Sequence, residues 1–149
     1  MLPLADVEKT LAPSDDRTTL VFPFEVPQGI RLLSLHMIYS PVWLEDREAS
    51  KALIQKAMRL YAPWEPVENW REYLPLSNLI TLSLDDPMGY RGNAHRRAGK
   101  QTHTLCAEAA SPGFTAGPIL PGTWRASVHI HSLVTKDCAF SLTVQGVDA

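Results

Sequence analysis

The chain has 149 residues, a length at which a single domain can bury a sizeable core. Hydrophobic residues make up 45% and charged residues 20%, as in globular proteins, and no apolar run approaches the roughly 20 residues of a membrane-spanning helix. The formal net charge of -2 supplies no overall attraction to nucleic acid or to an acidic membrane, so we expect neither as a partner.

Residues 1–17 carry Pro3, Pro13, Asp15 and Asp16, a composition typical of a weakly ordered leader or peripheral arm. We therefore expect a single domain over residues 18–149. The first six residues have neither the basic nor the apolar region of a secretory signal, which predicts a cytoplasmic protein.

Two antiparallel strands are expected at the start of the domain. Residues 20–26 alternate apolar and polar side chains, but Pro23 cannot donate to a neighbouring strand, so this strand should lie at a sheet edge. Pro27-Gln28-Gly29 turns the chain, and residues 33–39 again place apolar side chains on one face.

The pattern changes after Pro41. Asp46 can cap a helix that runs to Tyr61, in which apolar residues recur at spacings of three and four. Those positions are Ala49, Ala52, Leu53, Ala57, Leu60 and Tyr61. Together with the proline-rich loop that follows, this helix predicts an insertion over residues 42–76.

The loop of this insertion holds Trp64, Trp70 and Tyr73, which need something to cover them. We expect them to pack onto the β domain. If they are exposed, they predict an interaction surface for a partner protein, a carbohydrate or another small ligand.

The alternation returns in the second half of the chain, at residues 79–84, 101–108, 124–130 and 138–144. The first of these strands ends in an Asp-Pro-x-Gly turn. Short strands with Gly/Pro turns and no regular alternation with helices predict an all-β fold. We expect an antiparallel, jelly-roll-like β-sandwich of about seven to nine strands with one inserted α-helix at residues 46–61.

The turn motifs of this second half occur in a characteristic order. They are Asp86-Pro87-Met88-Gly89, Arg91-Gly92, Ala110-Ser111-Pro112-Gly113-Phe114, Gly117-Pro118-Ile119 and Pro121-Gly122-Thr123-Trp124. Together with the first strand, Phe22 to Pro27, they resemble the β-sandwich domain that precedes the catalytic domain in CehA/McbA-type metallohydrolases of the PHP superfamily, and more distantly a prepeptidase C-terminal jelly roll.

The resemblance implies a sandwich module without the catalytic domain, because the sequence ends at Ala149, directly after the last expected strand. The family's metal ligands and hydrolytic activity do not carry over to these residues, and we expect no cofactor. The predicted function is a non-catalytic accessory module that binds a partner protein, such as a separately encoded PHP-type metallohydrolase, or its own copies.

His129 and His131 allow a different hypothesis. Two histidines two apart on a strand project from one face and can share a metal ion, as in cupins. A small metal-dependent enzyme would need a third ligand, such as His36 or His103. The alternation of Trp124 to Ile130 instead predicts that His129 and His131 lie on the solvent face.

Basic residues gather between the turn and the next strand. Arg91, Arg96 and Arg97 are candidates for an anion-binding loop. The alternative is a solvated loop, which flanking glycines and the lack of interleaved aromatic residues favour.

Overall fold

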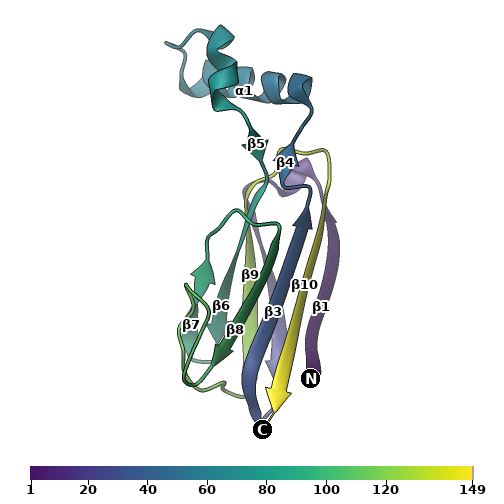
Figure 1. Cartoon of the computed structure of the whole chain (residues 1–149), viewed down its shortest axis with the longest axis vertical. Coiled ribbons are helices and arrows are strands. Elements are labelled where there is room, and N and C mark those ends of the chain that lie inside the picture. The colour runs from purple at the N-terminus through teal and green to yellow at the C-terminus, as the bar shows by residue number, and fades with distance from the viewer. Residues whose placement is uncertain (149) are drawn as a thin grey trace.

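The computed structural model describes residues 1–148 and consists of two four-stranded antiparallel sheets packed face to face (Figure 1). One sheet has the strand order β1-β10-β3-β8 and the other β2-β9-β6-β7. The bounds of these strands are β1 Leu2–Leu11, β2 Thr18–Val26, β3 Ile30–Ser40, β6 Leu79–Asp86, β7 Gly89–Ala94, β8 Lys100–Cys106, β9 Gly122–Ser132 and β10 Cys138–Asp148.

The strand pairing is that of a jelly roll. In chain order the first long strand pairs with the last, β1 with β10, and the second pairs with the seventh, β2 with β9. The third pairs with the sixth, β3 with β8, and the two middle strands form the hairpin β6–β7. This nesting of four antiparallel pairs, folded over into two sheets, confirms the predicted fold class.

The prediction of a leader at residues 1–17 was wrong for its first part. Residues 2–11 form β1, which pairs with β10 along its whole length and is the edge of its sheet. Its alternation is hidden in the sequence because Pro3 and a register shift near Ala5 interrupt it, and only Leu11 is fully buried. The second part of the segment forms the turn Pro13–Asp15 that leads to β2.

The prediction that the strand with Pro23 lies at a sheet edge was correct. β2 contains Pro23 and lies at the edge of the second sheet, where it pairs only with β9 among the described strands.

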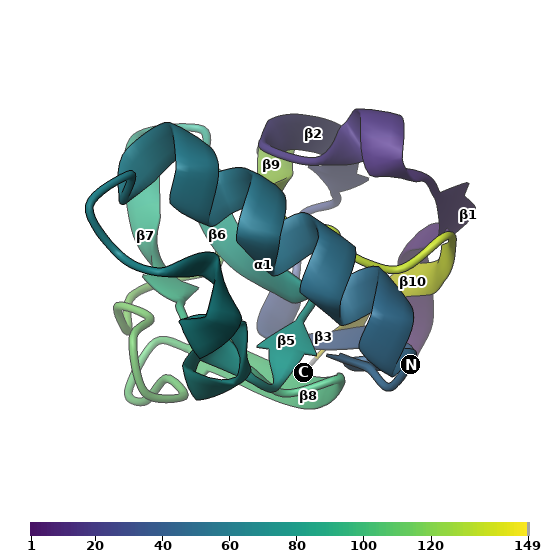
Figure 2. The same ribbon diagram turned by 90° about the horizontal axis from the view of Figure 1, so that it is seen from above.

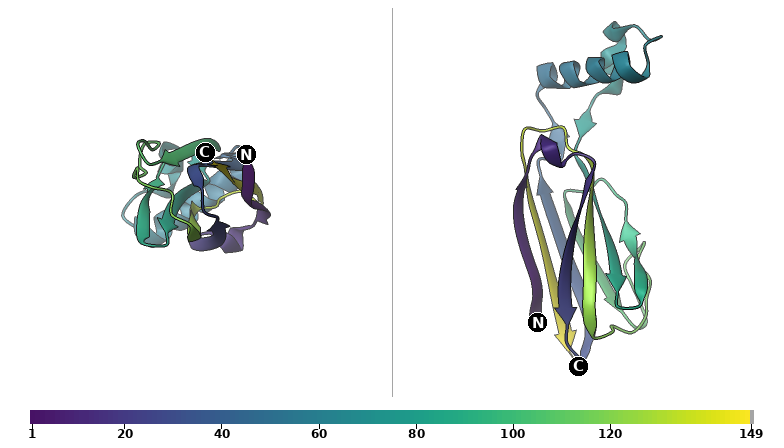
Figure 3. Two further views of the ribbon diagram at one scale, coloured as in Figure 1. Left: turned by 90° about the horizontal axis from the view of Figure 1, so that it is seen from below. Right: turned by 180° about the vertical axis from the view of Figure 1, so that it is seen from behind.

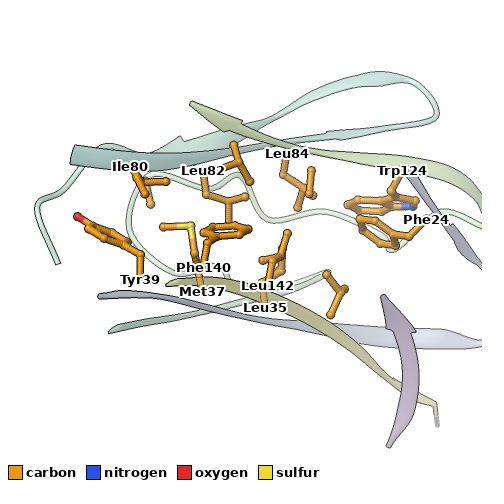
Figure 4. Packing of buried hydrophobic residues seen from close by; sticks show 14 of the residues in the cluster. Phe24, Leu35, Met37, Tyr39, Ile80, Leu82, Leu84, Trp124, Phe140 and Leu142 are labelled. Carbon is orange, nitrogen blue, oxygen red and sulfur yellow. The ribbon is translucent and has the colours of Figure 1, made fainter. Parts of the chain in front are cut away.

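Alternating apolar residues of both sheets fill the space between them. In Figure 4, Ile80, Leu82 and Leu84 of one sheet face Met37 and Leu142 of the other, and all five are fully buried. Burying a side chain of this size stabilises the fold by about 1.5–3 kcal/mol. This core holds the two sheets as a rigid support for the segments at either end.

The segment between β3 and β6 is the predicted insertion. It comprises β4 Trp43–Leu44, α1 Arg47–Tyr61, the 3-10 helix η2 Val67–Tyr73 and β5 Leu76–Ser77. β4 and β5 pair as a short two-stranded stalk. Figure 2 shows α1 running across one end of the sandwich, and Figure 3 shows that the start of β1 and the end of β10 lie at the opposite end.

Asp46 caps α1 as expected, since its carboxylate accepts a hydrogen bond of 3.0 Å from the backbone N–H of Ala49. The predicted buried face was wrong. The buried side chains of α1 are Ser50, Ile54 and Met58, and the last two pack against Trp70 of η2 in a second, smaller core. The insertion therefore has its own core, separate from that of the sandwich.

The root of the insertion is fixed by Asn78, which is fully buried. Its side-chain amide donates 2.9 Å hydrogen bonds to the carbonyl of Pro41 and to Oγ1 of Thr135, and its Oδ1 accepts from the backbone N–H of Val134. One side chain thus ties both ends of the insertion to the β9–β10 loop.

Among residues 1–148, the helices are too short or too polar to cross a membrane.

Candidate functional site

The Asp-Pro-x-Gly, Arg-Gly and Gly-Pro segments converge on one buried ion pair, at the end of the sandwich opposite α1. The Arg91 guanidinium donates a 2.9 Å hydrogen bond to the Asp86 carboxylate, and both side chains are less than a tenth exposed. It also donates to the backbone carbonyls of Thr115, Gly117 and Pro118 at 3.0–3.1 Å. Arg91 is therefore a structural residue, and its assignment to an anion-binding loop was wrong.

Two glycines of these motifs allow backbone segments to approach closely. A Cβ on Gly92 would lie 2.3 Å from the carbonyl oxygen of Gly113, and one on Gly113 would lie 2.0 Å from that of Asn93. Both glycines also have positive φ angles. Close to the same pair, Trp124 packs under Arg91, with 5.2 Å from the guanidinium carbon to the ring centre. The motif residues therefore hold the fold together at this end of the sandwich.

Arg96 and Arg97 are exposed in the loop that follows β7. The guanidinium carbon of Arg97 lies 5.8 Å from the ring centre of Trp43, at the base of the insertion. Since Arg91 is buried elsewhere, the three arginines do not form one site.

His129 and His131 lie on the outer face of their sheet, opposite the buried Val128 and Ile130. Both ring nitrogens of His129 have hydroxyl partners, Ser83 Oγ at 2.8 Å and Thr19 Oγ1 at 3.1 Å. The prediction that both histidines lie on the solvent face, made from the alternation of Trp124 to Ile130, is confirmed.

A third histidine, His95, lies beside His131 with 5.0 Å between ring centres. Burial, followed by the nearby His95 and His129, lowers the pKa of His131. In residues 1–148 the His, Cys, Asp and Glu side chains do not come together in any group of three or more that could hold a metal ion. His36 and His103, the candidate third ligands, hydrogen-bond within a different sheet, that of β3 and β8.

The three aromatic residues of the insertion do not form one surface. Trp70 is 3% exposed and is enclosed by Ile54, Met58 and the cations of Arg47, Lys51 and Arg71. Tyr73 is half-exposed and donates to the Glu65 carboxylate, while Trp64 is 80% exposed. The three side chains therefore form no joint surface, and the expectation that they pack onto the β domain was wrong, because Trp70 packs within the insertion and Trp64 and Tyr73 are exposed.

The exposed apolar surface of the insertion lies instead on α1. Leu53, Ala57, Leu60 and Tyr61 are all exposed, and their spacing places them in one stripe along the helix. Leu60 and Tyr61 are 63% and 67% exposed. This stripe contains four of the six residues that the sequence predicts as the buried face of the helix. The amphipathic pattern is present, but no part of the described chain covers it.

The α1 stripe forms one wall of a cleft of about 540 Å³ between the helix and the end of the sandwich. The opposite wall comes from the β9–β10 junction, with Ser132, Leu133 and Val134, and from Asp16 and Arg17 before β2. Lys56 lines the helix side and His131 the sandwich side. The cleft lies in the volume range of ligand-binding sites and combines an apolar lining with a few charged groups.

The sequence did not indicate Arg17, Lys56, Leu133 or Val134 as site residues. They lie on three separate segments, and only the pairing of the strands brings these segments to the same end of the sandwich. The one available signal was the apolar stripe of α1, which predicts a covered surface without naming what covers it.

No protein-family model matches the sequence, and no curated protein matches it. The resemblance to the CehA/McbA-type sandwich domain therefore rests on the turn motifs alone.

Proposed function

We propose that this chain is a binding module that docks a partner protein through the apolar stripe of α1 and the adjoining cleft. The main support for the proposal is that Leu53, Leu60 and Tyr61 have the spacing of a buried helix face. These three side chains are nevertheless exposed. Contiguous exposed apolar surface of this kind is a mark of interaction sites.

The exposed apolar residues are concentrated on the insertion. Residues 43–77 carry six of the twelve large apolar side chains that are exposed, although they are only 35 of the 148 residues described. The six are Trp43, Leu53, Leu60, Tyr61, Trp64 and Tyr73. A hydrophobic centre with aromatic residues is characteristic of protein interfaces.

The architecture suits such a role. The sandwich is a rigid support, and the stalk formed by β4 and β5 presents α1 beyond its end (Figure 1). The turn motifs shared with the CehA/McbA-type domain make a separately encoded PHP-type metallohydrolase one candidate partner. The docking surface itself lies in the insertion, outside the region of that resemblance, so the identity of the partner depends on residues that the family does not share.

Affinity capture from a lysate of the source organism tests the proposal. The chain is immobilised through its C-terminus, since the end of β10 that precedes it lies far from α1 (Figure 3). Three baits are compared: the natural chain, Leu60→Glu on the stripe, and Val21→Glu, which places the same charge on an exposed position of β2. We expect the same protein to be retained by the natural chain and by Val21→Glu, and to be lost with Leu60→Glu.

Equal recovery by all three baits would contradict the proposal, because capture would then not depend on the stripe. Circular dichroism of the three baits serves as a control for folding. Leu60 is already solvated in the free chain, so Leu60→Glu should change stability by no more than about 0.5 kcal/mol.

A further inference from the structure

The backbone of Arg17, at the edge of the cleft, is unusual. Arg17 has a φ angle of 60° and is the one non-glycine residue with positive φ in the part of the chain that the structure describes. Glycine and asparagine adopt this conformation with less strain than arginine. The side chain is 74% exposed, and its closest ionic contact is a 3.7 Å approach of Nε to the Asp16 carboxylate. Strained backbone conformations that no contact within the chain explains are often found at functional sites.

The carboxylate of Asp16, next to Arg17, already accepts a hydrogen bond within the chain. Oδ1 of Asp16 accepts a 2.7 Å hydrogen bond from the backbone N–H of Leu133, which ties together two segments of the sandwich wall of the cleft. On the opposite wall, Lys56 projects from α1, and it makes no ion pair within the described residues. An occupant of the cleft therefore meets a cation on each wall, Arg17 on the sandwich side and Lys56 beside the apolar stripe on α1.

A second copy of the chain is a poor match for this surface. α1 carries four cations, Arg47, Lys51, Lys56 and Arg59, and one acid, Glu48. Symmetric pairing of two α1 stripes would bring like charges together, which opposes association. The volume of the cleft also fits a short inserted segment better than a whole folded surface.

Building on the proposed function, we propose that the occupant of the cleft is a short apolar peptide segment of the partner that carries one or two carboxylate side chains. Its apolar residues contact Leu53, Leu60 and Tyr61. Its carboxylates pair with Arg17 from the sandwich and Lys56 from α1. Charge complementarity of this kind selects an acidic segment over a neutral or basic one of the same hydrophobicity.

Peptide selection tests this inference directly. The full chain, immobilised through its C-terminus, is used as bait for a phage library of random 12-residue peptides. We expect enriched peptides to combine large apolar residues with Asp or Glu. The best peptide, labelled with a fluorophore, is then titrated against the natural chain and its variants by fluorescence anisotropy.

Two variants separate binding from folding. Arg17→Gly removes the strain of the positive φ angle, so the melting temperature of the variant should rise by about 2–4 °C. The affinity of the same variant for the peptide should fall about three- to tenfold, because the cation is lost. Lys56→Gln should show a similar loss of affinity without a change in melting temperature. Arg125→Gln removes an exposed cation from β9 outside the cleft and serves as the matched control, with unchanged affinity.

The outcomes separate this inference from the function on which it rests. Enriched peptides without acidic residues, or natural affinity in Arg17→Gly and Lys56→Gln, would overturn the acidic segment and leave docking on the stripe intact. Failure to enrich any peptide, or peptide binding that survives Leu60→Glu, would overturn peptide docking in the cleft. A dimer in sedimentation equilibrium that dissociates in Leu60→Glu would make the second copy the occupant and overturn the inference.

Discussion

The buried pair of Asp86 and Arg91 gives the sharpest prediction about stability. Arg91→Met keeps most of the length and apolar contact of the side chain but removes its charge and all its hydrogen-bond donors. Asp86 then remains as a carboxylate that is 7% exposed without its cation. The carbonyls of Thr115, Gly117 and Pro118 also lose their donor.

Removing one partner of a buried ion pair costs about 3–5 kcal/mol, because the other charge stays in a poorly solvated site. Asp86 retains two backbone donors, the N–H groups of Met88 and Gly89 at 2.6 and 3.0 Å, which favours the lower part of this range. Adding Asp86→Asn removes the stranded charge while keeping an acceptor for the turn. The double variant should therefore be more stable than Arg91→Met alone by about 1–2 kcal/mol.

Urea unfolding followed by tryptophan fluorescence measures these differences, with Arg125→Met as a control at an exposed arginine. The control should stay within about 0.5 kcal/mol of the natural chain. A loss below about 1 kcal/mol for Arg91→Met would refute the reasoning, since it would mean that the pair is as well solvated as a surface salt bridge.

Three further predictions test other parts of the fold. His103 is 1% exposed, and its burial, followed by the charge of Arg96, lowers its pKa. Below about pH 6.5 the unfolded chain therefore binds a proton at His103 that the folded chain does not bind. The free energy of unfolding should fall as the pH decreases through this range. In urea titrations at several pH values, His103→Gln should flatten this fall, whereas an unchanged slope would contradict it. Leu82→Ala, at a fully buried core position, should cost about 2–5 kcal/mol in urea unfolding, whereas Leu60→Ala should cost less than about 0.5; similar losses would mean that Leu60 is covered within the chain. Asp46→Ala removes the N-cap of α1 and should destabilise the insertion by about 0.5–2 kcal/mol, seen as faster amide exchange in α1 with β6 unaffected.

Local patterns predicted much of the fold. The alternation of apolar and polar residues predicted β2, β3, β6, β8, β9 and β10, and Pro23 predicted that β2 lies at a sheet edge. Both predictions were possible because they depend on residues close together in the sequence. β1 was missed because Pro3 and the register shift near Ala5 interrupt its alternation. β7 was missed because its glycines and Arg91 are typical of a loop, and their roles depend on contacts with residues 113–118.

The site was harder to predict, for a physical reason. An apolar stripe such as that of Leu53, Leu60 and Tyr61 shows that a surface is suited to burial, but not which segment buries it. Trp70 occupies the neighbouring face of α1 instead, through a contact made within the insertion. The cations of the cleft lie 39 residues apart in the sequence, at positions 17 and 56, and only the jelly-roll topology makes them neighbours of one cleft.

The central claim is that the α1 stripe binds a partner. Its most direct test is site-specific photocrosslinking in the native cell, with a photoreactive amino acid at Ala57 in the middle of the stripe or at Val21 on the far edge strand. The account predicts one dominant crosslinked protein from position 57 and none from position 21. Crosslinks that are absent at position 57, or identical at the two positions, would contradict it.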